Sequence, residues 1–166
     1  MLKKALLLSC SLLLAACASY GGSGLMPGQA RLEDVQQTMG QPALRWQDPD
    51  GSMQLAYPRG PVGFDTFMVR LGPDGTLKSI ENVLDERHLA TVRVGMSKEQ
   101  VLRVLGPPDA GATAYFKARD ELVWDWRFYA PGTYEPMRMM VLFDATAGTV
   151  RSTMVKVEYF GYAENL

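Results

Sequence analysis

The chain has 166 residues, a formal net charge of −1 and only two cysteines, and 21% of its residues are charged. This weakly acidic composition gives no basic surface of the kind that nucleic acid binding requires, so we expect no nucleic acid partner. The length is sufficient for one compact domain with a sizeable core.

The first residues predict export and lipid attachment. Lys3 and Lys4 precede a short apolar run, which is the layout of a secretory signal and is too short for a membrane-spanning helix. The residues at 14–17, Leu-Ala-Ala-Cys, match a bacterial lipobox. We therefore expect residues 1–16 to be a lipoprotein signal peptide and Cys17 to carry the lipid, palmitate included. The alternative is an ordinary signal peptide followed by an unrelated cysteine.

Lipidation of Cys17 has consequences for location and for chemistry. Two or more acyl chains hold a protein stably on a membrane that the chain does not cross. By similarity to bacterial lipoproteins, Ala18 and Ser19 imply the outer membrane, with the protein facing the periplasm. Cys10 leaves with the signal peptide, so no thiol remains for a disulfide, a metal site or a nucleophile. Residues 17–24, rich in glycine and serine, predict a flexible tether.

An internal repeat of about 66 residues organises the remaining sequence, with copies at 25–86 and 92–160. The corresponding positions are Gly28 and Gly95, Val35 and Val101, Met39 and Leu105, Gly40 and Gly106, and Pro42 and Pro108. Because glycines, prolines and apolar residues recur in the same order, the sequence indicates a duplicated structural unit.

A short helix is predicted at the start of each copy. Ser97 can cap the helix of the second copy, and Gln100 completes a capping box. Gly106, followed by proline, stops that helix. The first copy has Ala30 where the cap would lie, so its helix start is expected to be weaker.

Extended runs follow each helix after a polar turn. They lie at 53–57, 67–71 and 76–83 in the first copy, and at 122–128, 139–144 and 149–159 in the second. Alternation puts four large apolar residues on one strand face: Leu122, Trp124, Trp126 and Phe128. We interpret this face as core covered by helices; an aromatic binding platform is the alternative. Asp125 and Arg127 lie on the opposite face and are expected to point to solvent. The predicted fold is α+β: two tandem repeats of short helices packed on one face of an antiparallel β-sheet.

The second copy resembles the SmpA/OmlA (BamE-like) family of outer-membrane lipoproteins. The resemblance rests on Gly95 to Ser97, Val101, the pair Leu105 and Gly106, Pro108, an aromatic strand, and the run Val141 to Asp144. It implies two short helices packed on a three-stranded antiparallel sheet. The first copy is degenerate, and the tandem arrangement resembles the β-lactamase inhibitory protein fold. Because BamE-like assembly factors carry one copy, the duplication favours a wide binding surface.

Catalytic and metal-binding patterns are not found, so we expect no enzyme activity, no metal site and no cofactor. His88 is the single histidine and lies in a charged joint between the copies, where we expect a solvated side chain. A catalytic histidine needs an activated partner, and zinc needs more ligands than this sequence offers.

Candidate partner-binding residues flank the Pro/Gly loops of the two copies: Arg59, Phe64, Tyr129 and Tyr134. Tyrosine is enriched in binding hot spots, although turn packing would also explain these aromatic residues. A second possible surface is an apolar strip formed if Met140 points outward beside Leu142.

Together these features predict a non-enzymatic outer-membrane lipoprotein that acts as a protein–protein interaction or assembly module in the cell envelope. Its partner would be another envelope protein, and Cys17 would attach it to the membrane. Two alternatives remain open: a scaffold subunit of the β-barrel assembly machinery, and an inhibitor of a periplasmic hydrolase.

Overall fold

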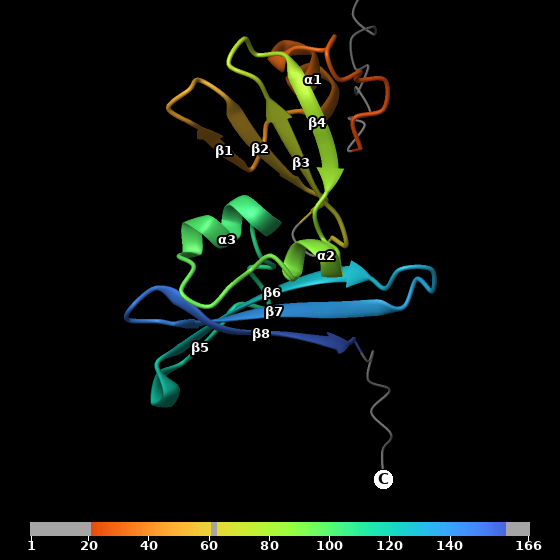
Figure 1. Ribbon diagram of the computed structural model, residues 1–166. Helices are drawn as coiled ribbons and strands as arrows, with labels where there is room; N and C mark the ends of the chain where they lie inside the picture. Colours follow the sequence, from red (N-terminus) through yellow and green to blue (C-terminus); the bar gives the residue numbers. More distant parts are fainter. Residues whose placement is uncertain (1–20, 61–62, 159–166) are drawn as a thin grey trace, which may run out of the picture.

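The computed structural model describes residues 21–60 and 63–158, which form an α+β fold with two four-stranded antiparallel sheets (Figure 1). The N-terminal sheet contains β1 (Leu44–Gln47), β2 (Met53–Pro58), β3 (Thr66–Leu71) and β4 (Leu77–Asn82), in that order. The C-terminal sheet contains β5 (Ala114–Phe116), β6 (Glu121–Tyr129), β7 (Pro136–Asp144) and β8 (Thr149–Val157), also in order. The helices are α1 (Leu32–Met39), α2 (Glu86–Leu89) and α3 (Lys98–Leu105), and a 3₁₀ turn spans Lys117–Arg119.

The predicted signal peptide, Cys17 and the first half of the tether lie outside the described residues. Within the part of the chain that is described, no helix is both long and apolar enough to cross a membrane. Lipid attachment at Cys17 therefore stays a prediction from the sequence.

Strands β1 and β5 are additions to the predicted elements. The six predicted extended runs correspond to β2, β3 and β4 and to β6, β7 and β8, but the segments expected to be polar turns contain one short strand each. β1 has four residues and β5 has three, too few for alternation to be visible. Each sheet thus has four strands instead of the three that the resemblance implied.

The predicted capping box of α3 is confirmed. The Gln100 N–H donates to Ser97 Oγ at 3.2 Å, and the Ser97 N–H donates to Gln100 Oε1 at 2.8 Å. In α1 the capping position falls on Arg31, whose N–H donates to the Asp34 carboxylate at 2.8 Å. Arg31 makes no side-chain cap, so α1 keeps one of the two interactions that start α3.

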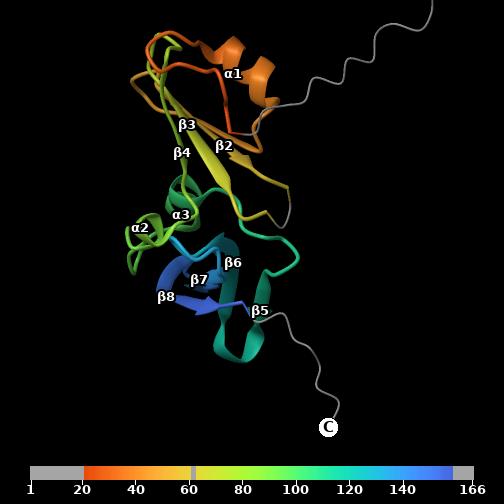
Figure 2. The same ribbon diagram turned by 90° about the vertical axis from the view of Figure 1, so that its right-hand side faces the viewer.

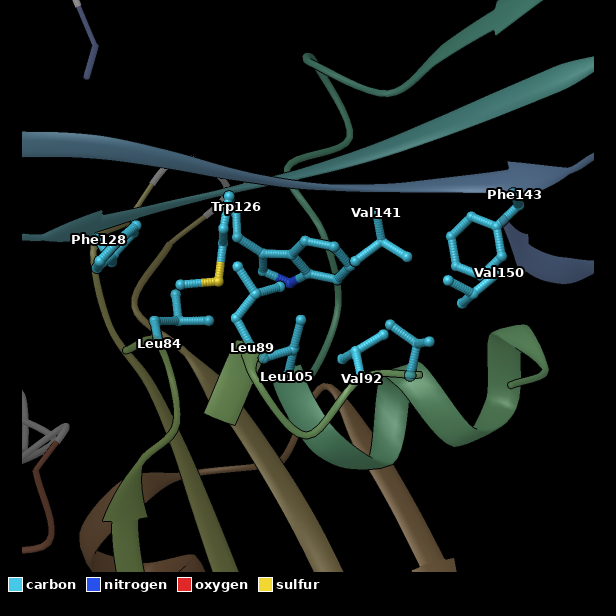
Figure 3. Close-up of a cluster of buried hydrophobic side chains, with 11 residues drawn as sticks. Leu84, Leu89, Val92, Leu105, Trp126, Phe128, Val141, Phe143 and Val150 are labelled. Atoms are coloured by element: carbon cyan, nitrogen blue, oxygen red, sulfur yellow. The ribbon is translucent and has the colours of Figure 1, made fainter. Parts of the chain in front are cut away.

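Two buried clusters join the helices to the strands. In the C-terminal half, Leu105 of α3 and Leu89 of α2 share a cluster with Trp126 and Phe128, both of which are buried as predicted (Figure 3). Leu122 and Trp124 are partly buried against the same cluster. In the N-terminal half, Val35 and Met39 of α1 share a cluster with residues of the sheet, namely Leu55, Tyr57, Val69, Leu71 and Leu77.

The segment before each long helix pairs with the start of the last strand of its sheet. In the N-terminal half, the Gly28 N–H donates to Leu77 O and the Leu77 N–H donates to Ala30 O, both at 2.8 Å. In the C-terminal half, the Gly95 N–H donates to Val150 O and the Val150 N–H donates to Met96 O, both at 2.9 Å. The halves therefore share a hydrogen-bonding arrangement as well as an order of elements.

α3 also contacts the N-terminal sheet and so connects the two halves of the chain (Figures 1 and 2). The Arg103 guanidinium donates to Asp48 at 2.8 Å and lies 5.6 Å from the centre of the Trp46 ring. The Gln54 side-chain amide donates to the Arg103 carbonyl at 2.5 Å. Arg103 thus contacts β1, the turn that follows β1, and β2.

Gly106, at the end of α3, brings the backbone close to the N-terminal sheet. A Cβ on this residue would lie 2.6 Å from Thr66 Cγ2 and 3.6 Å from Ala56 Cβ. Its carbonyl accepts a hydrogen bond from Trp126 Nε1 at 3.3 Å, so the same residue also contacts the C-terminal core. Glycine is needed here for the space as well as for its φ of 73°.

His88 differs from the sequence-based expectation of a solvated side chain. It lies in α2, and its side chain is 14% exposed. Its Nδ1 is 2.7 Å from Asp85 Oδ1, and Nε2 is 3.7 Å from Glu81. Asp85 also accepts the His88 backbone N–H and so caps α2, a four-residue helix too short for the sequence pattern to reveal.

A comparison of Gly106→Ala with Gly40→Ala tests the close approach. Both glycines have a positive φ with ψ near 180°, a conformation that costs other residues about 1–3 kcal/mol, but Gly40 has no atom within 4 Å of an added Cβ. We expect both variants to lose stability in urea denaturation, with Gly106→Ala losing at least about 1 kcal/mol more because of the clash with Thr66. Equal losses would contradict this role of Gly106.

Candidate interaction surface

Three of the four predicted partner-binding residues form one group, which we call the aromatic cluster: Phe64, Tyr129 and Tyr134. The Phe64 and Tyr129 rings are stacked, with centroids 4.2 Å apart and planes 8° apart. The Tyr134 ring packs edge-on against Tyr129 at 6.2 Å. Tyr129 is 45% exposed and Tyr134 is 81% exposed. Phe64 comes from the loop between β2 and β3 and the tyrosines from the end of β6 and the turn after it, so both halves of the chain build this surface.

Arg59, the fourth candidate, lies in an ion pair on the same loop as Phe64. Its guanidinium is 3.4 Å from Asp65, and its backbone N–H donates to the Asp65 carbonyl at 2.9 Å. Asp65 also accepts a hydrogen bond from Asn82 at 2.7 Å. The Arg59 side chain is 65% exposed. Arg59 thus lies on the loop that carries Phe64, and its role in binding stays a prediction.

A charged network supports the aromatic cluster from the C-terminal sheet. Arg127 lies with its guanidinium carbon 4.3 Å from the Phe64 ring centre and pairs with Glu158 at 2.7 Å. Arg138 pairs with Glu158 at 3.4 Å and with Asp125 at 2.8 Å. The four charges therefore alternate in sign along the face of the sheet, and the guanidinium at one end stacks on an aromatic ring.

The prediction that Asp125 and Arg127 point to solvent is wrong. Asp125 is 5% exposed, and the Arg127 side chain is 15% exposed. Alternation correctly assigns both to the face opposite Trp126, but it does not show what covers that face. Here charged partners, together with Phe64 from the other half, cover it.

Burial raises the pKa of the Asp125 carboxyl because the ionised form loses hydration. The hydrogen bonds and positive charge of Arg138 oppose this effect, and the same contact raises the pKa of Arg138. A buried carboxylate with one guanidinium partner is costly to leave unpaired. Among the groups around Asp125, Arg138 is therefore the one that most favours the ionised carboxylate.

The turn that carries Tyr134 holds this residue in a strained conformation. Tyr134 has a φ of 54°, although bulky side chains strongly disfavour the left-handed region. The turn is closed by hydrogen bonds from the Ala130 N–H to Glu135 O at 2.9 Å and from the Thr133 N–H to Ala130 O at 3.4 Å. Residues held in strained backbone conformations are concentrated at functional sites.

A pocket of about 210 Å³ lies beside the aromatic cluster, between the two halves of the chain. Pro58 and Asp65 line it from the N-terminal half, and Pro107, Asp109 and Arg127 line it from the C-terminal half. Its walls combine apolar ring carbons with charges of both signs. A pocket of this size can take one side chain of a partner beside the exposed tyrosines.

Groups suited to metal chemistry are not brought together in the described residues. Within 21–60 and 63–158, no three His, Cys, Asp or Glu side chains are placed to hold a metal ion. The aromatic cluster itself combines exposed tyrosine rings with neighbouring ion pairs and a nearby pocket.

The family described as "Outer membrane protein assembly factor BamE domain" matches residues 81–147. Residues 81–147 are thus similar to the BamE domain. The match begins in β4 and so includes α2 as well as α3, together with β5, β6 and β7. The BamE-like resemblance predicted from the sequence is thus confirmed for this half. The copy boundaries at 25–86 and 92–160 stay predictions.

Other comparisons add little to the BamE-like match. No curated protein matches the sequence. A crystal structure of a candidate β-lactamase inhibitor protein from Streptococcus mutans matches with 15% identity, covering 76% of this chain and 82% of that chain, at a TM-score of 0.33. This TM-score is too low to establish a shared fold.

An Arg138→Met variant should lose stability in a pH-dependent way. At neutral pH it leaves Asp125 ionised and buried without its partner, and we expect a loss of about 3–5 kcal/mol in the free energy of unfolding. Without Arg138 the folded-state pKa of Asp125 rises further above its unfolded value. The deficit relative to the parent chain should therefore shrink as the pH falls from about 7 to about 5, which urea denaturation at several pH values would measure.

The control for this variant is the double substitution Asp125→Asn with Arg138→Met. It has no carboxyl at this position, so its deficit should change much less across the same pH range. If the stability lost in Arg138→Met is the same at every pH, the pairing of a buried Asp125 carboxylate with Arg138 is contradicted.

Glycine and alanine at position 134 test the strained turn. Both substitutions remove the ring, and at an ordinary position glycine is the less stable of the two by about 0.5–1 kcal/mol. At a φ of 54° the order should reverse, because alanine keeps the left-handed penalty of about 1–2 kcal/mol and glycine does not. Thermal denaturation showing Tyr134→Ala more stable than Tyr134→Gly would contradict the strain.

Proposed function

We propose that this chain is a non-enzymatic outer-membrane lipoprotein that binds another envelope protein through the aromatic cluster. The observation that carries the proposal is the exposed Tyr129 and Tyr134 pair, held against Phe64 and beside a pocket. Large, stiff aromatic side chains bind with little loss of conformational entropy, and a rigid support reduces this cost further. The strain at Tyr134 supports a function for the exposed ring.

The membrane attachment in this proposal is a lipid on Cys17, followed by a tether that leaves the folded part in the periplasm. Its support comes from the lipobox and from the BamE-like family, whose description places it at the outer membrane. The tandem arrangement is also part of the proposal: we interpret the two halves as copies of one unit, with the first copy degenerate. Its support is the shared pairing of Gly28 with Leu77 and of Gly95 with Val150.

A role in outer-membrane protein assembly is the second candidate, and the family match favours it. The matched family is described as an assembly factor, so a scaffold subunit of the β-barrel assembly machinery is consistent with residues 81–147. In this version the aromatic cluster would contact another subunit. Inhibition of a periplasmic hydrolase gains no support from the comparisons.

Site-specific photocrosslinking tests the proposed surface. A photoreactive side chain at position 134 in the native envelope should give one defined protein adduct, and the Tyr129→Ala substitution should abolish it. Met26, which is 57% exposed and lies before α1, is the matched control position and should not give this adduct. The same adduct from both positions, or none from position 134, would contradict binding through the aromatic cluster.

Deletion of the gene separates the two candidates. A scaffold of barrel assembly should leave less β-barrel protein in the outer membrane when it is absent, and the parent gene should restore the level. Unchanged barrel content together with a specific adduct at position 134 would favour a different envelope partner.

A further inference from the structure

The outer edge of β8 is a long strand edge that is paired only at its start. Thr149 forms a bridge with Ser97, and Val150 exchanges hydrogen bonds with Gly95 and Met96. Beyond this point the strand continues to Val157, and residues 151–156 are all exposed. The opposite edge of the same sheet, β5, has only three residues.

The register of β7 and β8 shows which amides point away from the sheet. The Glu158 N–H donates to Pro136 O at 2.8 Å, so the backbone of Glu158 faces β7. Partners alternate between hydrogen-bonded and non-hydrogen-bonded pairs in an antiparallel ladder, and Met137 pairs with Val157 and Met139 with Val155. The backbone N–H and C=O groups of Thr153, Val155 and Val157 therefore point outward, where no protein backbone partner occurs among the described residues.

Side chains along this edge provide apolar surface on both faces of the sheet. Val155 is 38% exposed on the face that carries Met139, and Met154 is 50% exposed on the opposite face beside Met140. Met154 would thus extend the predicted apolar strip of Met140 and Leu142 to the sheet edge. In the N-terminal sheet, Gly22 lies against the Ile80 side chain of β4, with 2.6 Å between an added Cβ and Ile80 Cδ1.

Exposed basic residues lie near both ends of the edge, whereas Glu158, which follows Val157, is paired with Arg127 and Arg138. Arg93 precedes the segment that pairs with Val150, and Lys156 lies near the other end; both are exposed. Among the described residues, neither has a carboxylate within 4 Å, whereas Arg151 is already paired with Asp144 at 2.8 Å. A segment that is apolar in the middle and acidic at its ends would complement this edge.

We propose that the edge of β8 from Thr153 to Val157 accepts an extended acidic segment of a partner protein as a ninth strand of the fold, added antiparallel or parallel to β8. The outward amides supply the main-chain hydrogen bonds, and Val155 and Met154 contact alternate side chains of the added strand. Basic residues at both ends select for acidic flanks. This surface is separate from the aromatic cluster and does not depend on the function proposed above.

The test uses the full chain in detergent and a designed peptide of seven residues, with alternating valine and threonine and a glutamate at each end. Amide hydrogen exchange measured by NMR should slow at Thr153, Val155 and Val157 when the peptide is added, because these N–H groups gain acceptors. A matched peptide with lysine at each end should bind about tenfold more weakly, since its charges repel Arg93 and Lys156.

Val155→Pro is the decisive variant. Proline removes an outward N–H without removing a bond to β7, so the fold should be retained while peptide affinity falls about tenfold. Val155→Ala keeps the N–H and is the control for loss of the side chain; it should bind more tightly than Val155→Pro. If Val155→Pro fails to fold, the exchange measurement on the parent chain still decides.

Three outcomes would overturn the proposal. The first is no change in exchange at these amides with about 1 mM peptide. The second is equal binding of the acidic and basic peptides. The third is protection that rises with protein concentration in the absence of peptide, which would show that a second copy of the chain occupies the edge.

Discussion

The close approach of the backbone at Gly106 is the constraint on which the relation of the two halves depends. This residue ends α3, accepts a hydrogen bond from Trp126 and lies against Thr66 of the N-terminal sheet. A Cβ there would lie 2.6 Å from Thr66 Cγ2, so a side chain would require a shift close to the contacts of Arg103 with Trp46 and Asp48. Gly40, at the corresponding place in the first half, has free space around it. Gly40 and Gly106 thus occupy equivalent positions but have different structural roles.

The position of the two halves determines what the loops can form. Phe64 reaches the face of the C-terminal sheet because β3 begins beside Gly106, and it then stacks on Tyr129 and meets Arg127. The ion pairs that follow, from Arg127 through Glu158 and Arg138 to Asp125, place charges where the alternation of β6 alone would give a wet surface. Stacking and charge pairing therefore stabilise the same inter-sheet contact.

The sequence predicts an element well where a single pattern, such as strand alternation or a helix cap, determines it. Alternation located the long strands and assigned Trp126 and Phe128 to the core, and the Ser97 capping box located α3. Short elements such as β1 and α2 were missed because three or four residues carry too little periodicity.

The candidate site was predicted in part. Phe64, Tyr129 and Tyr134 were identified individually by residue type and loop position, but their contact depends on how the halves pack. The burial of Asp125 was missed for the same reason, since a neighbour from the other sheet and an ion pair cannot be read from one strand. An acid and a base two residues apart on a strand face, near others of opposite sign, would have been the available clue.

The shared origin of the aromatic cluster has a thermodynamic consequence. Because Phe64 comes from one half and Tyr129 from the other, the complete cluster exists only while the halves are docked. A ligand that recognises the stacked pair must then favour the docked state, by an amount that grows with its concentration relative to its dissociation constant. Ligand binding at the aromatic cluster and docking of the two halves are thus coupled equilibria, and each favours the other.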